Sequence, residues 1–349
     1  MPVYKNEKRK TYYCAFYYQD WTGERKKKKK EGFKKRSEAQ QWEREFLAKQ
    51  QNNADMNFGT LVKLYMEDVE TRVRYTTFQG KKYIVNLKIL PYFENMNIVD
   101  ITPNHIRKWQ NILKKKGFTQ SYLKTINIQL SAIFNFAIKY YNLKSSPALK
   151  AGSMGKKGVN TMQFWTLKEF KKFIKCDDKP ISNLAFKILF WTGMRSGELI
   201  ALTWEDINLN DKTINISKTY TRLNGKDIIN EPKTPKSKRI ISISDHLCKD
   251  IKTYKEKLYK IKESDRLFNF TKFFLPYQME RVCKISGVKK IRIHDLRHSH
   301  ASLLIELGFS PLLISERLGH EKIQTTLNTY SHLYPNKQNV LAKKLDDLY

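Results

Sequence analysis

Acidic residues and cysteines are both scarce in this 349-residue sequence. Asp and Glu number 34 against 66 Lys and Arg, which leaves a formal net charge of +32. The four cysteines (Cys14, Cys176, Cys248 and Cys283) lack C-x-x-C spacing, so we expect neither a disulfide framework nor a zinc finger. Free cysteines of this kind suit a protein of the reducing cytosol. There is no apolar run of about 20 residues and no signal-peptide hydrophobic segment, so we expect no membrane insertion. The excess positive charge therefore predicts nucleic acid as the polyanionic partner.

Residues 1–50 predict a small sheet with one helix. An aromatic, strand-like run at 11–18 is followed by a turn at 20–23 and then by a basic run. Ser37 precedes a helical stripe that includes Trp42 and Phe46. Like-charge runs are ordinarily solvated or disordered, but these cations lie in a hairpin with alternating aromatic residues, which favours a DNA-binding sheet. The candidate DNA contacts are Arg25, Lys26, Lys27, Lys28, Lys29 and Lys30.

Residues 57–145 predict a bundle of four helices. Thr60 is the expected cap of the first helix, the second ends at Pro91, and the third runs from Thr102 to Gly117. The fourth covers about 121–140. The basic helix ends include Lys114 and Lys115, which are candidate DNA contacts, although lysine-rich faces often serve solubility alone.

Residues 146–160 lack an apolar period and are rich in Gly, Ser and Lys, so they predict an interdomain linker. Lys156 and Lys157 are candidate contacts if this linker crosses a DNA backbone. Residues 161–349 predict a mainly helical domain with a small antiparallel sheet from strand-like pieces at 213–217, 227–231 and 239–243. The expected fold is therefore a multidomain α+β protein.

The last domain carries a separated set of polar residues that suit phosphate chemistry. His294 and Arg297 are three residues apart at the start of a helical pattern, so they share a face. His320 follows a glycine, and Tyr330 comes ten residues later. Arg195 starts another helix. Taken singly, each of these residues is more simply explained as an ordinary surface or core residue, but together they suggest a phosphate pocket beside a nucleophile.

A metal site is the main alternative for the histidines. His294 and His298 are four residues apart, which is a spacing that can hold a metal. The sequence has no H-E-x-x-H motif and no suitably spaced cysteine, and His298 and His300 cannot share one helical face. We therefore expect no metal site.

Four motifs occur in a fixed order in the last domain: TGMRSGE at 192–198, HDLRHS at 294–299, LGH at 318–320 and TYSH at 329–332. Together they resemble the tyrosine recombinase (phage integrase) family. The resemblance covers residues 160–349 firmly. The helical region looks like that family's core-binding domain, and the N-terminal sheet is similar to the arm-binding domains of integrases from phages and integrative elements.

The resemblance implies a nucleophile and an electrostatic clamp. Tyr330 would attack a phosphodiester, giving a 3′-phosphotyrosine and a free 5′-hydroxyl. Arg195 and Arg297 would offer forked donors to the non-bridging oxygens, where charge builds in the transition state. Glu198 would orient Arg195. The energy of the broken bond stays in the tyrosyl ester, so neither ATP nor a metal ion is implied as a cofactor.

The resemblance also implies roles in proton transfer. His294 would act as a base towards the phenol, and His320 would hydrogen-bond the scissile phosphate. A lysine would protonate the leaving 5′-oxygen. Lys233 fits best, with Lys236 and Lys238 left as alternatives.

The implied partners are core-type and arm-type sites on double-stranded DNA, with a homotetramer on two duplexes. An excisionase and a host DNA-bending protein are further partners, and the bacterial cytoplasm, at the nucleoid, is the expected location. The segment after Tyr330 has helical spacing and could dock on a neighbouring protomer or on its own domain. Rival functions are a type IB topoisomerase-like relaxing enzyme and a DNA-binding regulator without chemistry. A metal-dependent nuclease is disfavoured because Asp265 and Asp295 are isolated.

Overall fold

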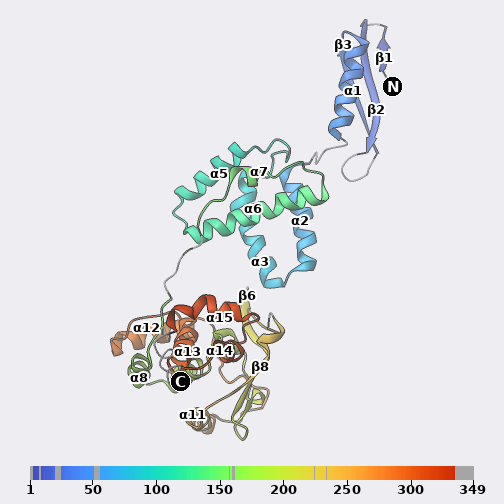
Figure 1. The fold of residues 1–349 in the computed structure, drawn as a ribbon. Coiled ribbons are helices and arrows are strands. Elements are labelled where there is room, and N and C mark those ends of the chain that lie inside the picture. The colour runs from blue at the N-terminus through green and yellow to red at the C-terminus, as the bar shows by residue number, and fades with distance from the viewer. Residues whose placement is uncertain are drawn as a thin grey trace, which may run out of the picture. The chain divides into compact units, whose positions relative to one another are not determined.

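The computed structural model describes residues 3–7, 9–19, 25–50, 56–156, 158, 162–223, 225–232 and 234–334. The chain divides into two compact units, Met1–Val159 and Asn160–Tyr349. Helices and small antiparallel sheets together make a mixed α+β protein, as expected (Figure 1). Within the described residues, no helix combines the length and the apolar character needed to cross a membrane.

The N-terminal sheet has three antiparallel strands and one helix across one face: β1 (Val3–Asn6), β2 (Thr11–Gln19), β3 (Arg25–Phe33) and α1 (Arg36–Gln50) (Figure 1). Cys14 and Phe16 of β2 are buried with Ala39 of α1, and Trp42 packs against them. The predicted hairpin and helix are confirmed, and β1 is a third strand that the sequence did not reveal. The predicted turn at 20–23 lies outside the described residues.

The predicted helical bundle is present, with four main helices: α2 (Phe58–Arg72), α3 (Tyr75–Ile84), α5 (Pro103–Lys115) and α6 (Gln120–Tyr140). Asn57, and not Thr60, caps α2, because its side chain accepts a hydrogen bond from the Thr60 N–H. The predicted start of the third helix at Thr102 is confirmed, since Thr102 caps α5 by accepting a hydrogen bond from the His105 N–H.

The prediction that a helix ends at Pro91 is wrong. A π-helical turn, η1 (Val85–Ile89), connects α3 to a short helix, α4 (Leu90–Phe93), that includes Pro91. The Leu90 N–H reaches back five residues to the Val85 carbonyl. Proline lacks an N–H and its ring crowds the preceding turn of a regular α-helix, so the wider turn accommodates it.

The prediction that the linker starts at residue 146 is wrong for its first part. Residues Pro147–Ala151 form α7, which packs against α5 and α6, and Ser146 caps it by accepting a hydrogen bond from the Leu149 N–H. Ala148, Ala151 and Met154 are buried in the core of the bundle. A serine followed by proline is a helix-start signal, and alanines are small enough to let α7 approach closely. Lys156 is exposed, and Lys157 lies outside the described residues.

The second unit begins with three helices, α8 (Leu167–Lys175), α9 (Pro180–Thr192) and α10 (Ser196–Ala201), followed by a 3-10 turn, η2 (Trp204–Asp206). Its strands are β4 (Ile207–Asn208), β5 (Thr213–Ile216), β6 (Thr219–Leu223), β7 (Lys226–Asn230) and β8 (Arg239–Ser242), with a 3-10 turn, η3 (Pro235–Ser237), before β8. The strands pair in the order β4-β5-β8, and β6 and β7 form a separate hairpin. The three predicted strands are confirmed, and β4 and β6 are additional.

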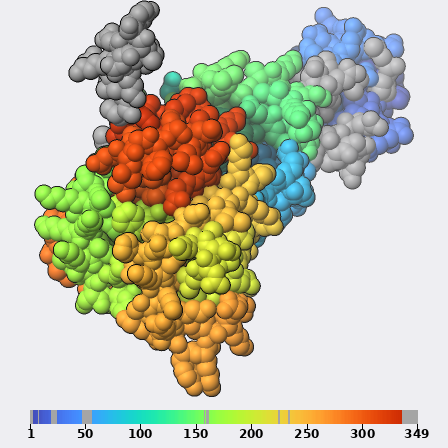
Figure 2. Space-filling view, turned by 60° about the horizontal axis from the view of Figure 1, so that its bottom comes forward, coloured from blue at the N-terminus to red at the C-terminus, as the bar shows by residue number. Residues whose placement is uncertain are grey.

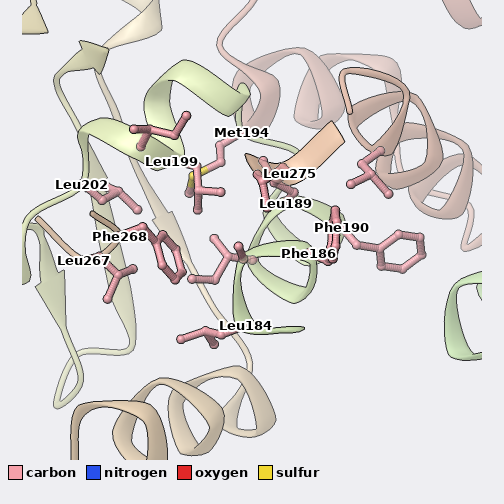
Figure 3. Close-up of a cluster of buried hydrophobic side chains, with 14 of the residues drawn as sticks. Leu184, Phe186, Leu189, Phe190, Met194, Leu199, Leu202, Leu267, Phe268 and Leu275 are labelled. Atoms are coloured by element: carbon pink, nitrogen blue, oxygen red, sulfur yellow. The ribbon is translucent and has the colours of Figure 1, made fainter. Parts of the chain in front are cut away.

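The remaining helices are α11 (Asp245–Glu256), α12 (Phe274–Ser286), α13 (Asp295–Glu306), α14 (Pro311–Leu318), α15 (Ile323–Tyr330) and the 3-10 turn η4 (Ser331–Leu333). Helix α9 is buried along most of its length and lies at the centre of the core (Figure 3). Leu184, Leu189 and Phe190 of α9 are part of the cluster that also includes Leu199 of α10 and Phe268 (Figure 3). This rigid core supports the helix ends that carry the polar residues.

Candidate active site

Arg297 is the most tightly held of the predicted site residues. It lies in the first turn of α13 and is only 3% exposed. Its Nη1 donates to the Gly193 carbonyl at 2.9 Å, and its Nη2 donates to the Leu318 carbonyl at 2.7 Å. These carbonyls belong to the ends of α9 and α14, so one guanidinium joins three helices. Burial, followed by the charge of Arg195, lowers the pKa of Arg297 to about 9.

Gly193 is required by this arrangement. Its φ of +67° is the left-handed conformation that ends α9, which favours glycine. A Cβ at this position would lie 2.6 Å from Cδ2 of His300, on α13. Glycine therefore lets α9 and α13 approach closely enough for Arg297 to reach the carbonyl.

Arg195 precedes α10 and is held by Glu198. Its backbone N–H donates to Glu198 Oε2 at 2.9 Å, and its Nη1 lies 2.7 Å from Oε1. The side chain of Glu198 is buried, whereas that of Arg195 remains 39% exposed. Burial opposes ionisation of Glu198, but the guanidiniums of Arg239 and Arg195 outweigh it and lower the pKa of the carboxyl. Because the Glu198 side chain is only 3% exposed, water screens this ion pair less than it screens an ordinary surface pair.

The pKa values of His294 and His320 are both lowered, which favours the neutral imidazoles. His294 immediately precedes α13, and packing around its ring, followed by the charges of Arg297 and Arg195, lowers its pKa. His320 follows Gly319 at the end of α14, and its Nδ1 lies 2.7 Å from Oγ1 of Thr326. Burial and the same two arginines lower the pKa of His320 to about 4. Neutral imidazoles can accept or donate a proton beside a phosphate.

Tyr330 ends α15 and is 1% exposed. Burial raises the pKa of its phenol to about 12, although the charge of Arg297 acts in the opposite direction. Its hydroxyl lies 2.8 Å from Nδ1 of His298. His298 follows His294 by one helical turn, and their rings meet edge to face with centroids 5.3 Å apart. The structure thus brings Tyr330, His294 and Arg297 around the first turns of α13.

Two residues of this region were missed by the sequence analysis. His298 was considered only as a metal ligand, although its spacing from His294 already placed both on one helical face. Arg239 opens β8 and lies 3.0 Å from Glu198, with its side chain 7% exposed. Nothing local distinguishes Arg239 from the cations that precede it in sequence.

The hairpin lysines are only partly described. Lys233 lies outside the described residues. Lys238 pairs with Glu231 at 3.1 Å, and Lys236 is exposed in η3. Across the described ranges, no group of three or more His, Cys, Asp or Glu residues could hold a metal ion. The residues near the end of the described chain, drawn in red, gather on one face of the molecule (Figure 2).

Comparisons with known proteins identify the family of this chain. Residues 163–337 match the model of the phage integrase family, residues 57–114 match the phage integrase N-terminal SAM-like domain, and residues 2–50 match an arm DNA-binding domain. The ICEBs1 integrase of Bacillus subtilis is 35% identical over 310 residues, covering 84% of this chain and 83% of that protein. The integrase of Staphylococcus phage L54a is 28% identical over 291 residues, covering 68% of this chain and 82% of that protein.

Solved structures share the fold. The Tn1549 transposon integrase in complex with a circular intermediate DNA superposes with a TM-score of 0.67 at 20% identity, covering 83% of this chain and 99% of that one. A lambda integrase dimer bound to a COC′ core site gives a TM-score of 0.61 at 19% identity, covering 96% and 95%. The chain therefore belongs to the phage integrase family and is a tyrosine-type site-specific DNA recombinase.

Proposed function

We propose that this recombinase breaks one DNA strand by attack of the Tyr330 hydroxyl on a backbone phosphorus. The Oη–P bond forms as the P–O5′ bond breaks, giving a 3′-phosphotyrosine and a free 5′-hydroxyl. Arg195 and Arg297 bind the non-bridging oxygens and offset the charge that builds there. The observation that carries this proposal is the anchoring of Arg297 by two helix-end carbonyls, close to Arg195 and Tyr330.

The proton transfers are assigned to neighbouring groups. His294 takes the phenolic proton, and His320 donates a hydrogen bond to the phosphate. Lys233 protonates the leaving 5′-oxygen, with Lys236 and Lys238 as the alternatives in the same segment. Because the phenol is buried against His298, Tyr330 must turn outwards before Oη can come within about 3.5 Å of phosphorus.

Rejoining follows from the same chemistry in reverse. The 5′-hydroxyl of a second duplex attacks the tyrosyl ester, so strands are exchanged without ATP. We propose a homotetramer on two duplexes as the assembly that brings the second hydroxyl close. A lambda integrase tetramer bound to a Holliday junction shares the fold, with a TM-score of 0.59 at 20% identity. An excisionase and a host DNA-bending protein are the further partners proposed for directional integration and excision, in the bacterial cytoplasm.

The N-terminal sheet is proposed to bind arm-type DNA through its face opposite α1. Cross-strand pairing puts Tyr17 beside Lys27 on that face, and the Arg25 guanidinium lies 4.5 Å from the Tyr17 ring centroid. Tyr4 and Tyr13 stack there with centroids 5.3 Å apart. Aromatic rings and cations on an open sheet face suit a polyanionic duplex. Lys114, Lys115, Lys156 and Lys157 remain proposed contacts to core-type DNA.

The decisive experiment is covalent capture on a nicked suicide duplex that carries the recombination site. Wild-type protein is expected to accumulate a protein–DNA adduct in the presence of EDTA, and Tyr330→Phe to form none while binding with unchanged affinity. An adduct in Tyr330→Phe would move the nucleophile elsewhere. Binding without any wild-type adduct would support the regulator, and relaxation of plasmids lacking the site would support the topoisomerase-like enzyme.

A further inference from the structure

Three segments that carry proposed catalytic residues meet at one side chain that has no assigned role, Arg239. Building on the proposed function, we propose that Arg239 is a positioning residue for strand cleavage. Arg239 shares the Glu198 carboxylate with Arg195, and this leaves the positive charge of Arg195 available for the scissile phosphate. It also fixes the position of the turn that precedes His320. It does not itself touch the DNA in this proposal.

Arg239 contacts three separate parts of the second unit, Asn160–Tyr349, which we call the catalytic unit. Its Nη2 donates to Glu198 Oε2 at 3.0 Å, next to the start of α10. Its Nε donates to the Arg317 carbonyl at 2.8 Å, near the end of α14. Its Nη1 donates to the Ser237 carbonyl at 3.0 Å, in the 3-10 turn η3. One planar guanidinium therefore fixes the mutual positions of α10, α14 and the turn before β8.

The charges explain why a second arginine is needed at Glu198. Glu198 is 2% exposed, so its charge is poorly screened by water. Arg195 alone would form a neutral pair with it, whereas the triad with Arg239 carries one net positive charge. The partly exposed member of that triad is Arg195, so this charge is presented where a phosphate can approach. A cation that binds the transition state more strongly than the ground state accelerates cleavage.

Arg239 also packs directly beneath the turn before His320. Gly319 has a φ of +69°, and a Cβ built on it would lie 3.0 Å from both Cδ and Nη1 of Arg239. It would also lie 3.0 Å from the Lys236 carbonyl oxygen. The backbone at Gly319 therefore lies against the Arg239 side chain, and moving that side chain would shift His320.

A purely structural role is the alternative, and the chain offers a matched control for it. Arg317 is partly buried, and it donates to the Trp191 and Ser242 carbonyls and to Nε2 of His300. Among the described residues, burial and the neighbouring charge of Arg239 lower the pKa of Arg317, and no carboxylate is among the groups that shift it. Loss of either guanidinium removes carbonyl contacts, but only the loss of Arg239 changes the charge balance at Glu198.

The test measures single-turnover adduct formation on two nicked suicide duplexes. One has an ordinary scissile phosphodiester, and the other has an uncharged methylphosphonate there. On the phosphodiester we expect Arg239→Met to slow cleavage about 10²-fold or more, the scale seen when one oxyanion donor is lost. On the methylphosphonate, which carries less charge for Arg195 to offset, its rate should lie within about tenfold of wild type. Arg317→Met should lose the same factor on both duplexes.

Equal losses on both duplexes for Arg239→Met would overturn the proposal and leave Arg239 structural. If Arg239→Met does not fold, Arg239→Lys takes its place and should show a smaller loss confined to the phosphodiester. If wild type attacks the methylphosphonate too slowly to measure, the double variant E198Q/R239M decides. The double variant lacks the carboxylate as well as its second cation. It should cleave the phosphodiester at least about tenfold faster than R239M, because the effects of Glu198 and Arg239 are coupled. Absence of recovery overturns the proposal. The wild-type adduct and its loss in Tyr330→Phe report separately on the proposed function.

Discussion

The catalytic unit and the N-terminal sheet use positive charge in opposite ways. Arg297 is nearly fully buried and bonded to two carbonyls, and Arg195 is anchored to a buried carboxylate. By contrast, residues 25–30 of β3 are all exposed. A fixed, desolvated guanidinium suits the stabilisation of charge in a transition state, whereas exposed cations on a sheet suit salt-dependent attraction to a duplex.

Net charge alone therefore does not locate function in this protein. The excess of +32 predicts a polyanionic partner but is spread over the whole chain. What distinguishes the site is how its cations are held. Substitutions in the catalytic unit should therefore change the rate of cleavage with little effect on affinity, and substitutions in the sheet should do the reverse.

The largest effect is expected at the two arginines of the site. Arg195→Ala and Arg297→Ala should each slow adduct formation on a nicked duplex by about 10²–10³-fold or more, with most DNA affinity retained. The two variants should differ in their free energy of unfolding. Arg297→Ala leaves the Gly193 and Leu318 carbonyls unpaired in the interior, at a cost of about 1–3 kcal/mol each, whereas Arg195 is partly exposed. Adduct kinetics, band-shift titrations and thermal melts check this, and near-normal cleavage by either variant would refute the assigned roles.

A second expectation concerns acid, because two half-buried histidines of the catalytic unit have lowered pKa values. The pKa values of His298 and His320 are lowered to about 4, chiefly by burial, from about 6.5 in an unfolded chain. Between these values the unfolded chain binds protons that the folded chain does not. The contribution of these two histidines to the free energy of unfolding is therefore fully present above about pH 6.5 and is lost as the pH falls towards 4.

Thermal melts of the full chain across that range measure this loss. His298→Gln should flatten the dependence, since it removes one group that the unfolded state protonates preferentially. A melting temperature that stays constant from pH 7 to 4.5 would show that these rings titrate normally in the folded protein. The N-terminal sheet has no histidine, so it should contribute none of the loss that comes from imidazoles.

Much of the site could be predicted because each motif is local. His294 and Arg297 share one helical turn, and the glycines before Arg195 and His320 mark helix ends, so short stretches of sequence already fix these relations. The roles proposed for Arg195, His294, Arg297, His320 and Tyr330 came from the order of motifs, and they remain to be tested by substitution.

What the sequence did not reveal depends on contacts between distant residues. The bond between Arg239 and Glu198 joins positions 41 residues apart, and that between His298 and Tyr330 joins positions 32 apart. Similarly, α7 was read as linker because its helix signals are short, and its alanines became core only by packing on α5 and α6. Pro91 was read as a helix end because the π-helical turn that accommodates it has no sequence signature.

The smallest effect is expected within the run of cations in the sheet, where the register divides them between two faces. Lys28 and Lys30 pair across β2 with Phe16 and Cys14, on the side covered by α1, and Lys30 Nζ lies 5.2 Å from the Trp42 ring centroid. Lys27 and Lys29 lie on the opposite, open face. An unstructured charge run would show no such division.

The comparison is therefore between two double variants of equal charge. Lys27→Ala/Lys29→Ala should weaken binding to arm-type DNA by about tenfold and make the salt dependence shallower by about two phosphate contacts, each giving a slope of about 0.9. Lys28→Ala/Lys30→Ala should change affinity by less than about threefold, because on that face the lysine stems mainly cover aromatic surface. Fluorescence anisotropy over a range of salt concentrations separates the two. Equal losses for both pairs would mean that the run acts only through its total charge, and the distinction between an ordered sheet face and a solvated tract would then disappear.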